Sequence, residues 1–241
     1  MIQANCRARL TPEDLDFLVE TLDPDGSQRA PLDELTSDAD SLDRLLDDPR
    51  LFSRLLEAPR LLDVSPFFFY YIVVRRVFLE HGIDEGGAVA DYVGALLSYH
   101  LEARRQDNEP PPESVYLVDL VSAMAGARDP EHAFALQAEI GNRALFLAGV
   151  FPDWIYHRSV HGRRPVDLAY YEDMGRRHYA AAARSRVARR HSLGEVLGFM
   201  ADRFPMLRQA LNDLVDEHLH LGRRPLGADR LCRQAIYRVR N

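Results

Sequence analysis

The segment from Phe67 to His81 constrains the fold most, because it is apolar on nearly every side of a helix. It reads FFFYYIVVRRVFLEH. A helix on a protein surface has an apolar stripe and a polar face, whereas a helix that is apolar all round is buried among other elements. Ser65 and Pro66 provide a start for this helix, and Gly82 provides a stop. The segment therefore predicts a helix at the centre of a bundle.

A second segment with the same character extends from Asp129 to Phe151, with Pro130 at its first helical position. Helix start and stop signals recur along the chain, and no segment shows the clear alternating pattern of a strand. The 241 residues are 46% hydrophobic, which is enough to bury a large core without metal or disulfide bonds. We therefore expect an all-α protein, a compact multi-helix bundle of about nine or ten helices around these two buried hydrophobic helices.

One proline-rich stretch interrupts the helical pattern. Residues 105–114 read RQDNEPPPES, and three consecutive prolines favour an extended, solvated connector. We expect a single helical domain over residues 1–241, with this loop as the candidate subdomain boundary.

The clearest periodicity lies between residues 193 and 221, where successive residues of one stripe are alternately four and three positions apart. This is the heptad seam of packed helices. Pro205 lies inside it and predicts one kinked helix or two helices that meet there. The seam can pack within the chain or form a homodimer, and the sequence is compatible with both. Its members are Leu193, Leu197, Met200, Phe204, Leu207, Leu211, Leu214, His218 and Leu221.

The cysteines and the apolar stretches bear on the compartment. Cys6 and Cys232 are the only cysteines, so there is no disulfide framework. The first residues have no apolar run of signal-peptide length. The most hydrophobic stretch, Pro66 to Val74, is well short of the roughly 20 residues that span a bilayer. We expect a cytoplasmic protein with no transmembrane segment.

The motifs of several enzyme classes are missing. The sequence contains no GxGxxG, GxxxxGK[ST], HExxH or GxSxG. This excludes P-loop nucleotide hydrolysis, zinc proteolysis of the HExxH type and hydrolases with a nucleophile elbow. Whether the chain is an enzyme stays open, and no cofactor is indicated.

Polar groups inside the two buried segments are the candidate binding site. Glu139 and Arg143 are four residues apart, the spacing of an ion pair on one helix face, and Asn142 lies beside them. Tyr71 and Arg75 have the same spacing, and an arginine held beside a tyrosine hydroxyl can bind a carboxylate or a phosphate. Buried charges are costly even when they are paired. The five residues therefore either line a ligand pocket between the two buried helices or satisfy the hydrogen bonds of a core.

Histidines supply the candidate metal ligands. Asp153, His157 and His161 are spaced four residues apart, which places all three on one face if the segment is helical. Pro152 and Gly162 bracket only about two turns, so the alternative is that these are exposed turn residues, and we assign no metal site. His218 lies on the heptad seam, where a histidine is either a hydrogen-bonded core residue or a ligand. Di-iron enzymes of ferritin-like bundles use Glu-x-x-His pairs from facing helices. We expect no such pair in this chain, because Glu80 and His81, like Glu131 and His132, are adjacent and cannot face one centre, so a di-iron centre would need irregular ligands.

Charge is distributed unevenly along the chain. Residues 1–152 contain 13 arginines and 27 acidic residues, whereas residues 153–241 contain 17 arginines and 10 acidic residues. Either the two halves attract each other, or the arginine-rich half binds nucleic acid or another polyanion. The pI of about 5.7 argues against nucleic acid. The arginines concerned are Arg163, Arg164, Arg176, Arg177, Arg184, Arg186, Arg189, Arg190, Arg223, Arg224, Arg230, Arg233, Arg238 and Arg240.

The leading functional expectation is a cytoplasmic helical protein that binds a partner protein or a small ligand. Two alternatives remain. One is a metal-dependent, di-iron-like oxidoreductase of the helical-bundle type. The other is a nucleic-acid-binding protein that uses its arginine-rich C-terminal half. A short basic helix expected over Ala228–Val239 would dock on the acidic half of the chain.

Overall fold

The structure is a computed structural model that describes residues 5–57, 63–84, 87–107, 117–161 and 166–219. Within these ranges it is all-α, with no strand, which confirms the expected fold class. The helices are α1 (Pro12–Leu22), α2 (Arg29–Thr36), α3 (Ala39–Leu46), α4 (Pro49–Glu57), α5 (Pro66–Glu80), α6 (Ala88–Asp107), α7 (Leu117–Ala125), α8 (Pro130–Val150), α9 (Pro152–His161), α10 (Leu168–Ala183), α11 (Arg186–Arg190), α12 (Gly194–Asp202) and α13 (Phe204–Leu214). A 3-10 turn, η1 (Arg7–Arg9), precedes them, and a π-helical turn, η2 (Val215–Leu219), follows them.

The two helices expected to be buried, α5 and α8, are buried. Most side chains of α5 between Phe68 and Phe78 are covered, including the guanidinium of Arg75. On α8, every residue from Ile140 to Val150 except Arg143 is buried. Neither helix has a free polar face because each is packed from several sides.

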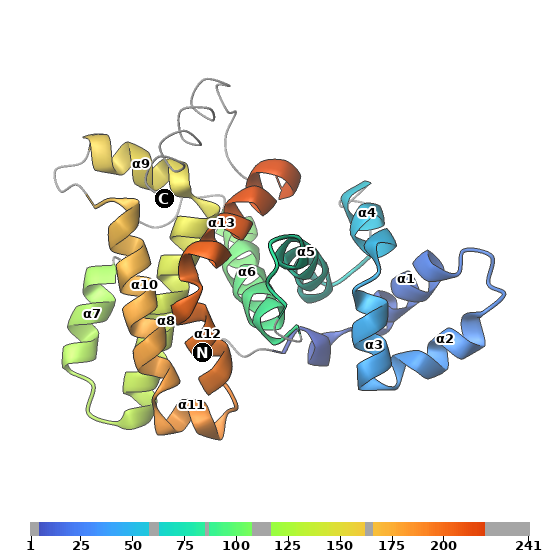
Figure 1. The fold of residues 1–241 in the computed structure, drawn as a ribbon, viewed down its shortest axis with the longest axis horizontal. Coiled ribbons are helices and arrows are strands. Elements are labelled where there is room, and N and C mark those ends of the chain that lie inside the picture. Colours follow the sequence, from blue (N-terminus) through green and yellow to red (C-terminus); the bar gives the residue numbers. More distant parts are fainter. Residues whose placement is uncertain (1–4, 58–62, 85–86, 108–116, 162–165, 220–241) are drawn as a thin grey trace.

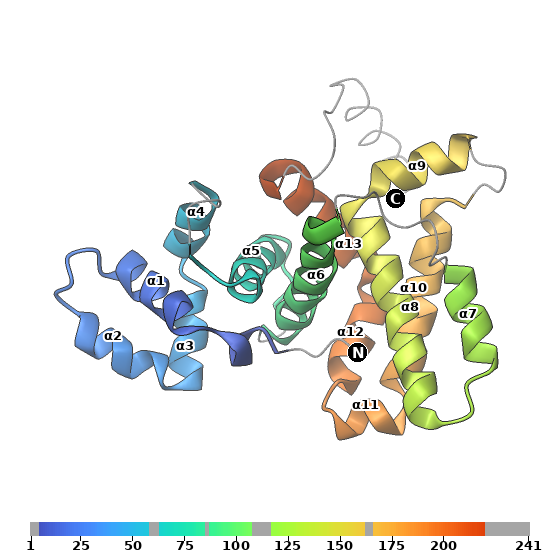
Figure 2. The ribbon, with the colours of Figure 1, turned by 180° about the vertical axis from the view of Figure 1, so that it is seen from behind.

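Helices α5 and α6 lie side by side and connect two groups of helices. Figures 1 and 2 show α1–α4 on one side of this pair and α7–α13 on the other. In the second group, α8 packs against α10, α13 and α7, and α12 packs on α10. Helix α13 also reaches α5. The core is therefore continuous from the first group to the last.

The described part contains thirteen α-helices instead of the nine or ten expected. Two of the additional helices are α2 and α9. Pro31 and Pro152 lie in their first turns, where a missing N–H costs nothing. Helix α11 is separate because the Ser185 hydroxyl accepts a hydrogen bond from the Ala188 amide and so begins a new helix. Helix α6 continues to Asp107, into the segment expected to be a loop, and residues 108–114 of that loop lie outside the described residues.

The heptad seam packs inside the chain. As expected from Pro205, the segment forms two helices, α12 and α13, which meet at Arg203. Seven seam residues, from Leu193 to Leu214, are at most 6% exposed. The apolar side chains that a homodimer through the seam would use are therefore already covered within the described part of the chain, and the seam gives such a dimer no support. His218 packs edge-on against Phe52, and Leu221 lies outside the described residues.

Asp14 ties the start of α1 to the start of α5. Its buried carboxylate accepts hydrogen bonds from the Thr11 amide at 2.8 Å and from the amide and hydroxyl of Ser65, both at 2.7 Å. Ser65 is in turn the N-cap of α5, where its hydroxyl accepts from the Phe68 amide. One carboxylate therefore joins the caps of two helices, although Asp14 and Ser65 are 51 residues apart in the sequence.

We expect Asp14→Asn to lower the free energy of unfolding by about 2 kcal/mol, because the amide nitrogen turns a donor toward groups that already donate. The measurement is urea unfolding followed by circular dichroism at pH 7. Asp38→Asn is the matched control, since Asp38 is an exposed N-cap of α3 and asparagine caps equally well. Equal effects of the two variants would contradict the role given to Asp14.

None of the described helices combines the length with the apolar character that a membrane-spanning segment requires.

Candidate functional site

Arg75 faces the first group of helices and is fully engaged there. Its Nε and Nη2 donate to the two carboxylate oxygens of Asp47, both at 2.8 Å, and its Nη1 donates to Asp84 at 2.8 Å. These hydrogen bonds raise the pKa of the Arg75 guanidinium further above its ordinary value. The side chain is only 9% exposed. Arg75 therefore fastens α5 to the corner between α3 and α4.

Tyr71 lies on the same helix, beside a cluster of charged side chains that includes Arg7 of the N-terminal segment. Burial raises the pKa of its phenol, and the positive charge of Arg7 partly opposes that rise. Arg7 forms an ion pair with Asp43, and its amide donates to the carboxylate of Asp91 at 3.0 Å. Burial raises the pKa of Asp91. This group holds η1, α3 and α6 against α5.

Asn142 is the centre of a buried polar group in the other half of the molecule. Its Oδ1 accepts hydrogen bonds from the hydroxyls of Tyr92 on α6 and Tyr179 on α10, both at 2.9 Å. All three side chains are at most 1% exposed. Burial raises the pKa of both phenols, so they remain neutral donors. The group joins α6, α8 and α10 inside the core.

Glu139 and Arg143 form the ion pair expected from their spacing, with Nη2 and Oε1 3.2 Å apart. Their side chains are 32% and 23% exposed, so the pair lies at the edge of the core. The Arg143 Nε is buried and has no hydrogen-bond partner among the described residues.

The five predicted site residues thus form two groups instead of one. Glu139, Asn142 and Arg143 are together on α8, and Tyr71 and Arg75 belong to α5 and its N-terminal neighbours. Helices α6 and α13 each contact both α5 and α8. In the structure, Arg75 and Asn142 satisfy hydrogen bonds of the core.

A third buried polar group was missed by the sequence reasoning. The Arg208 Nε donates to Glu172 at 2.6 Å, and its Nη1 donates to Asn212 at 2.9 Å. The Asn212 amide donates to the carbonyls of Ala148 and Gly149 near the end of α8. Arg208 and Asn212 are four residues apart and each follows a leucine of the seam. That spacing could have indicated a hydrogen-bonded pair on one face of the helix.

The structure describes two of the three candidate metal ligands on α9. Helix α9 is helical as supposed, which places Asp153 and His157 on one face, but the side chain of His161 lies outside the described residues. Glu217 and His220 do have the Glu-x-x-His spacing, a pair that the sequence reasoning overlooked, and His220 also lies outside the described residues. Within the described part of the chain, no three His, Cys, Asp or Glu side chains gather as metal ligands would.

His178 makes the stability of the second group of helices depend on pH. Its Nδ1 lies 2.6 Å from Oε1 of Gln137, and burial, together with the neighbouring Arg177, lowers its pKa below the ordinary value of 6.5. The unfolded state therefore binds more protons below pH 6.5. The stability that neutral His178 contributes is complete above pH 6.5 and is lost as the pH falls toward the folded-state pKa.

We expect His178→Gln to flatten the pH dependence of stability, because glutamine does not bind a proton. Urea unfolding at pH 7.5 and pH 5 should show a larger loss on acidification for the natural protein than for the variant. Parallel losses would show that other groups control the acid response.

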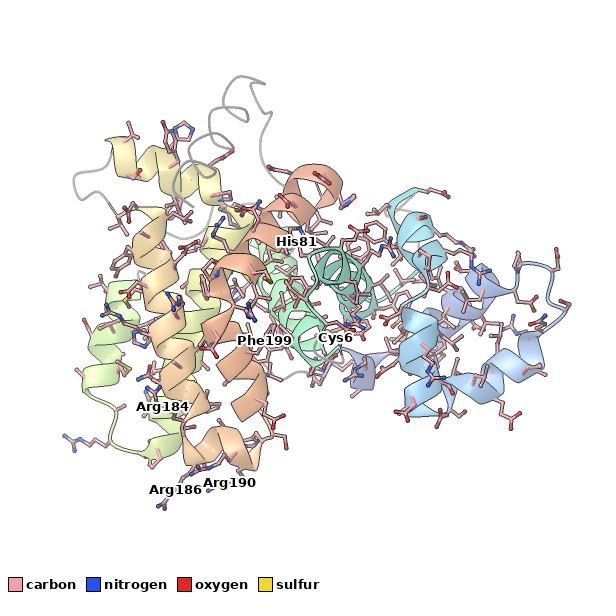
Figure 3. All side chains as sticks on the ribbon, in the orientation of Figure 1. Cys6, His81, Arg184, Arg186, Arg190 and Phe199 are labelled. Atoms are coloured by element: carbon pink, nitrogen blue, oxygen red, sulfur yellow. The ribbon has the colours of Figure 1, made fainter. Side chains whose placement is uncertain are left out.

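A strongly basic surface is formed by α10 and α11. Residues 176–194 contain six arginines and no aspartate or glutamate. All six are exposed, and we call them the arginine surface: Arg176, Arg177, Arg184, Arg186, Arg189 and Arg190. Figure 3 shows Arg186 and Arg190 projecting from the end of the bundle formed by α11.

Few acidic groups balance the arginine surface. Arg177 forms an ion pair with Asp173, and Arg190 forms one with Glu131. The other four arginines have no ion-pair partner within the described ranges. The remaining arginines of the hypothesis, Arg163, Arg164 and those beyond residue 219, lie outside the described residues.

Comparison of the chain with protein-family models, with curated proteins and with solved structures gave no match.

Proposed function

We propose that this protein binds nucleic acid through the arginine surface of α10 and α11. The observation that carries the proposal is a run of six exposed arginines with no acidic residue between them, four of them without an ion-pair partner in the described part of the chain. A guanidinium matches the geometry of a phosphate and remains charged at every physiological pH. Phosphate contacts supply most of the affinity of proteins for nucleic acids.

The surroundings of the arginines favour nucleic acid over a protein partner. Specific protein interfaces contain apolar or aromatic anchors at their centre. Between residues 176 and 194, the large apolar side chains are Tyr179, Val187 and Leu193, and all three are buried. The surface therefore offers positive charge without an apolar anchor. Contacts to the phosphates of a nucleic acid need only such charge.

The net charge of −7 does not oppose this proposal, because the acidic residues lie elsewhere. Residues 5–57 contain 14 acidic residues and 6 arginines. They form α1–α4, on the far side of α5 from α10 and α11 (Figure 1). Helices are about 10 Å across, and the Debye length is about 8 Å at physiological salt. Salt therefore screens the acidic helices from a ligand at the arginine surface.

The test is the fluorescence anisotropy of a labelled 20-base-pair DNA duplex at 50 mM salt. We expect binding in the micromolar range, typical of contacts to phosphates alone. The variant R184Q/R186Q/R189Q should bind about tenfold more weakly or worse. The matched control is R29Q/R44Q/R50Q, which removes the same charge from the acidic helices and should keep the natural affinity.

Two results would contradict the proposal. One is the absence of binding by the natural protein at 50 mM salt. The other is an equal loss in both triple variants, which would assign the effect to net charge instead of to this surface. The expectation of a protein partner or small ligand stays a prediction, since the five residues expected to line its pocket lie in two groups.

A further inference from the structure

We infer that the arginine surface binds double-stranded nucleic acid along its phosphate backbone, without regard to base sequence. This inference rests on the proposed function and specifies its ligand. The juxtaposition that carries it is a row of arginines on α10 that continues around a corner onto α11, with no exposed aromatic side chain among residues 176–190.

The row follows from the register of the two helices. Arg177 and Arg184 are seven residues apart, so they lie on the same face of α10, two turns and roughly 10 Å from each other. Arg184 is the C-cap of α10. The chain then turns into α11, which adds Arg186, Arg189 and Arg190 beyond the end of the row. Phosphates of one duplex strand recur every ~3.4 Å along the axis, so the α10 row alone spans about three of them.

The corner between the helices is built firmly. Ser185 caps α11, and Val187 and Ala188 are buried beneath it, so α11 is anchored to the core although it has only five residues. The arginines are therefore held by packed elements, which suits a ligand with a regular array of charges.

The side chains beside the row do not suit unpaired bases. Proteins that bind single strands stack bases on aromatic side chains. The only Phe, Tyr or Trp between residues 172 and 198 is Tyr179, and its ring is buried with its hydroxyl bonded to Asn142. A duplex exposes its phosphates and keeps its bases stacked on each other, so it needs only the arginines.

The same geometry argues against sequence readout. A recognition helix must enter the major groove with a free face. Helix α11 is only five residues long, and α10 is held between α8 and α12. The arginines therefore contact the outside of the duplex, where phosphates carry no direct sequence information.

Four probes at 50 mM salt test the inference with the full chain: a 20-base-pair DNA duplex, one of its strands, a duplex of unrelated sequence, and polyglutamate as competitor. We expect the duplex to bind at least fivefold more tightly than the single strand and the two duplexes to agree within twofold. R184Q/R186Q/R189Q should weaken both duplexes equally, and R29Q/R44Q/R50Q should weaken neither.

The outcomes separate the inference from the proposed function. A single strand that binds as tightly as the duplex, or duplexes that differ tenfold, would overturn the inference and leave nucleic-acid binding standing. No binding of any nucleic acid would overturn both. Polyglutamate that competes as well as the duplex would also overturn both, because the surface would then favour any polyanion.

Discussion

Replacing Asn142 with leucine is expected to lower the free energy of unfolding by about 4 kcal/mol. The side chains have a similar shape, but leucine cannot accept the hydrogen bonds that the Tyr92 and Tyr179 hydroxyls donate at 2.9 Å. Each hydroxyl would remain buried without a partner, which costs about 1–3 kcal/mol. Urea unfolding at pH 7 measures the change.

The matched control removes the hydroxyls as well. In N142L/Y92F/Y179F no buried donor is left unpaired, so most of the lost stability should return, because replacing all partners by apolar groups of the same shape is nearly neutral. If Asn142 instead belongs to a ligand site, N142L would leave stability almost unchanged and the triple variant would restore nothing. That result would contradict the structural role assigned here.

Gly175→Ala is expected to lower the free energy of unfolding by about 2 kcal/mol. A Cβ at this position would overlap the ring of Phe204, which is completely buried where α13 begins. Because the ring is completely buried, it can shift only by displacing its neighbours, and overpacking of this kind costs about 1–3 kcal/mol, occasionally more. The cost exceeds the gain in helix propensity, which is about 1 kcal/mol.

Gly198→Ala is the control for this prediction, because it makes the same change inside α12 where the nearest atom is the Ala183 Cβ at 4.0 Å. With space available, the substitution should raise the free energy of unfolding by about 0.5–1 kcal/mol. Thermal unfolding followed by circular dichroism would show opposite shifts in Tm for the two variants. A shift of the same sign in both would contradict the close packing of α10 on α13.

Helices whose character shows in a short stretch of sequence were predicted correctly. The apolar character of α5 and α8 is visible in any window of their sequence, and burial followed from it. The break at Pro205 was predicted for the same reason. Helices α2, α9 and α11 were not predicted. Proline breaks a helix in its interior but also begins one, and serine occurs both in turns and at helix starts. Only the residues that follow distinguish a turn from a helix start.

The candidate site shows where sequence reasoning stops. The pair Glu139 and Arg143 was predicted because both partners lie on one helix. The acceptor of Arg75, Asp47, could not be predicted, since it is 28 residues away and only tertiary packing brings it near. The arginine surface was visible as a cluster, but its exposure and the distance to the acidic helices depend on the fold.

The salt dependence of duplex binding tests the central claim most directly. The logarithm of the affinity should fall with the logarithm of salt concentration, by about 0.9 per phosphate contact. With four or five arginines in contact, we expect a slope of about −4 for the natural protein and for R29Q/R44Q/R50Q. For R184Q/R186Q/R189Q, which lacks three of these contacts, the slope should be less steep by about 2.7. The same slope in all three proteins would contradict the claim that this surface holds the ligand.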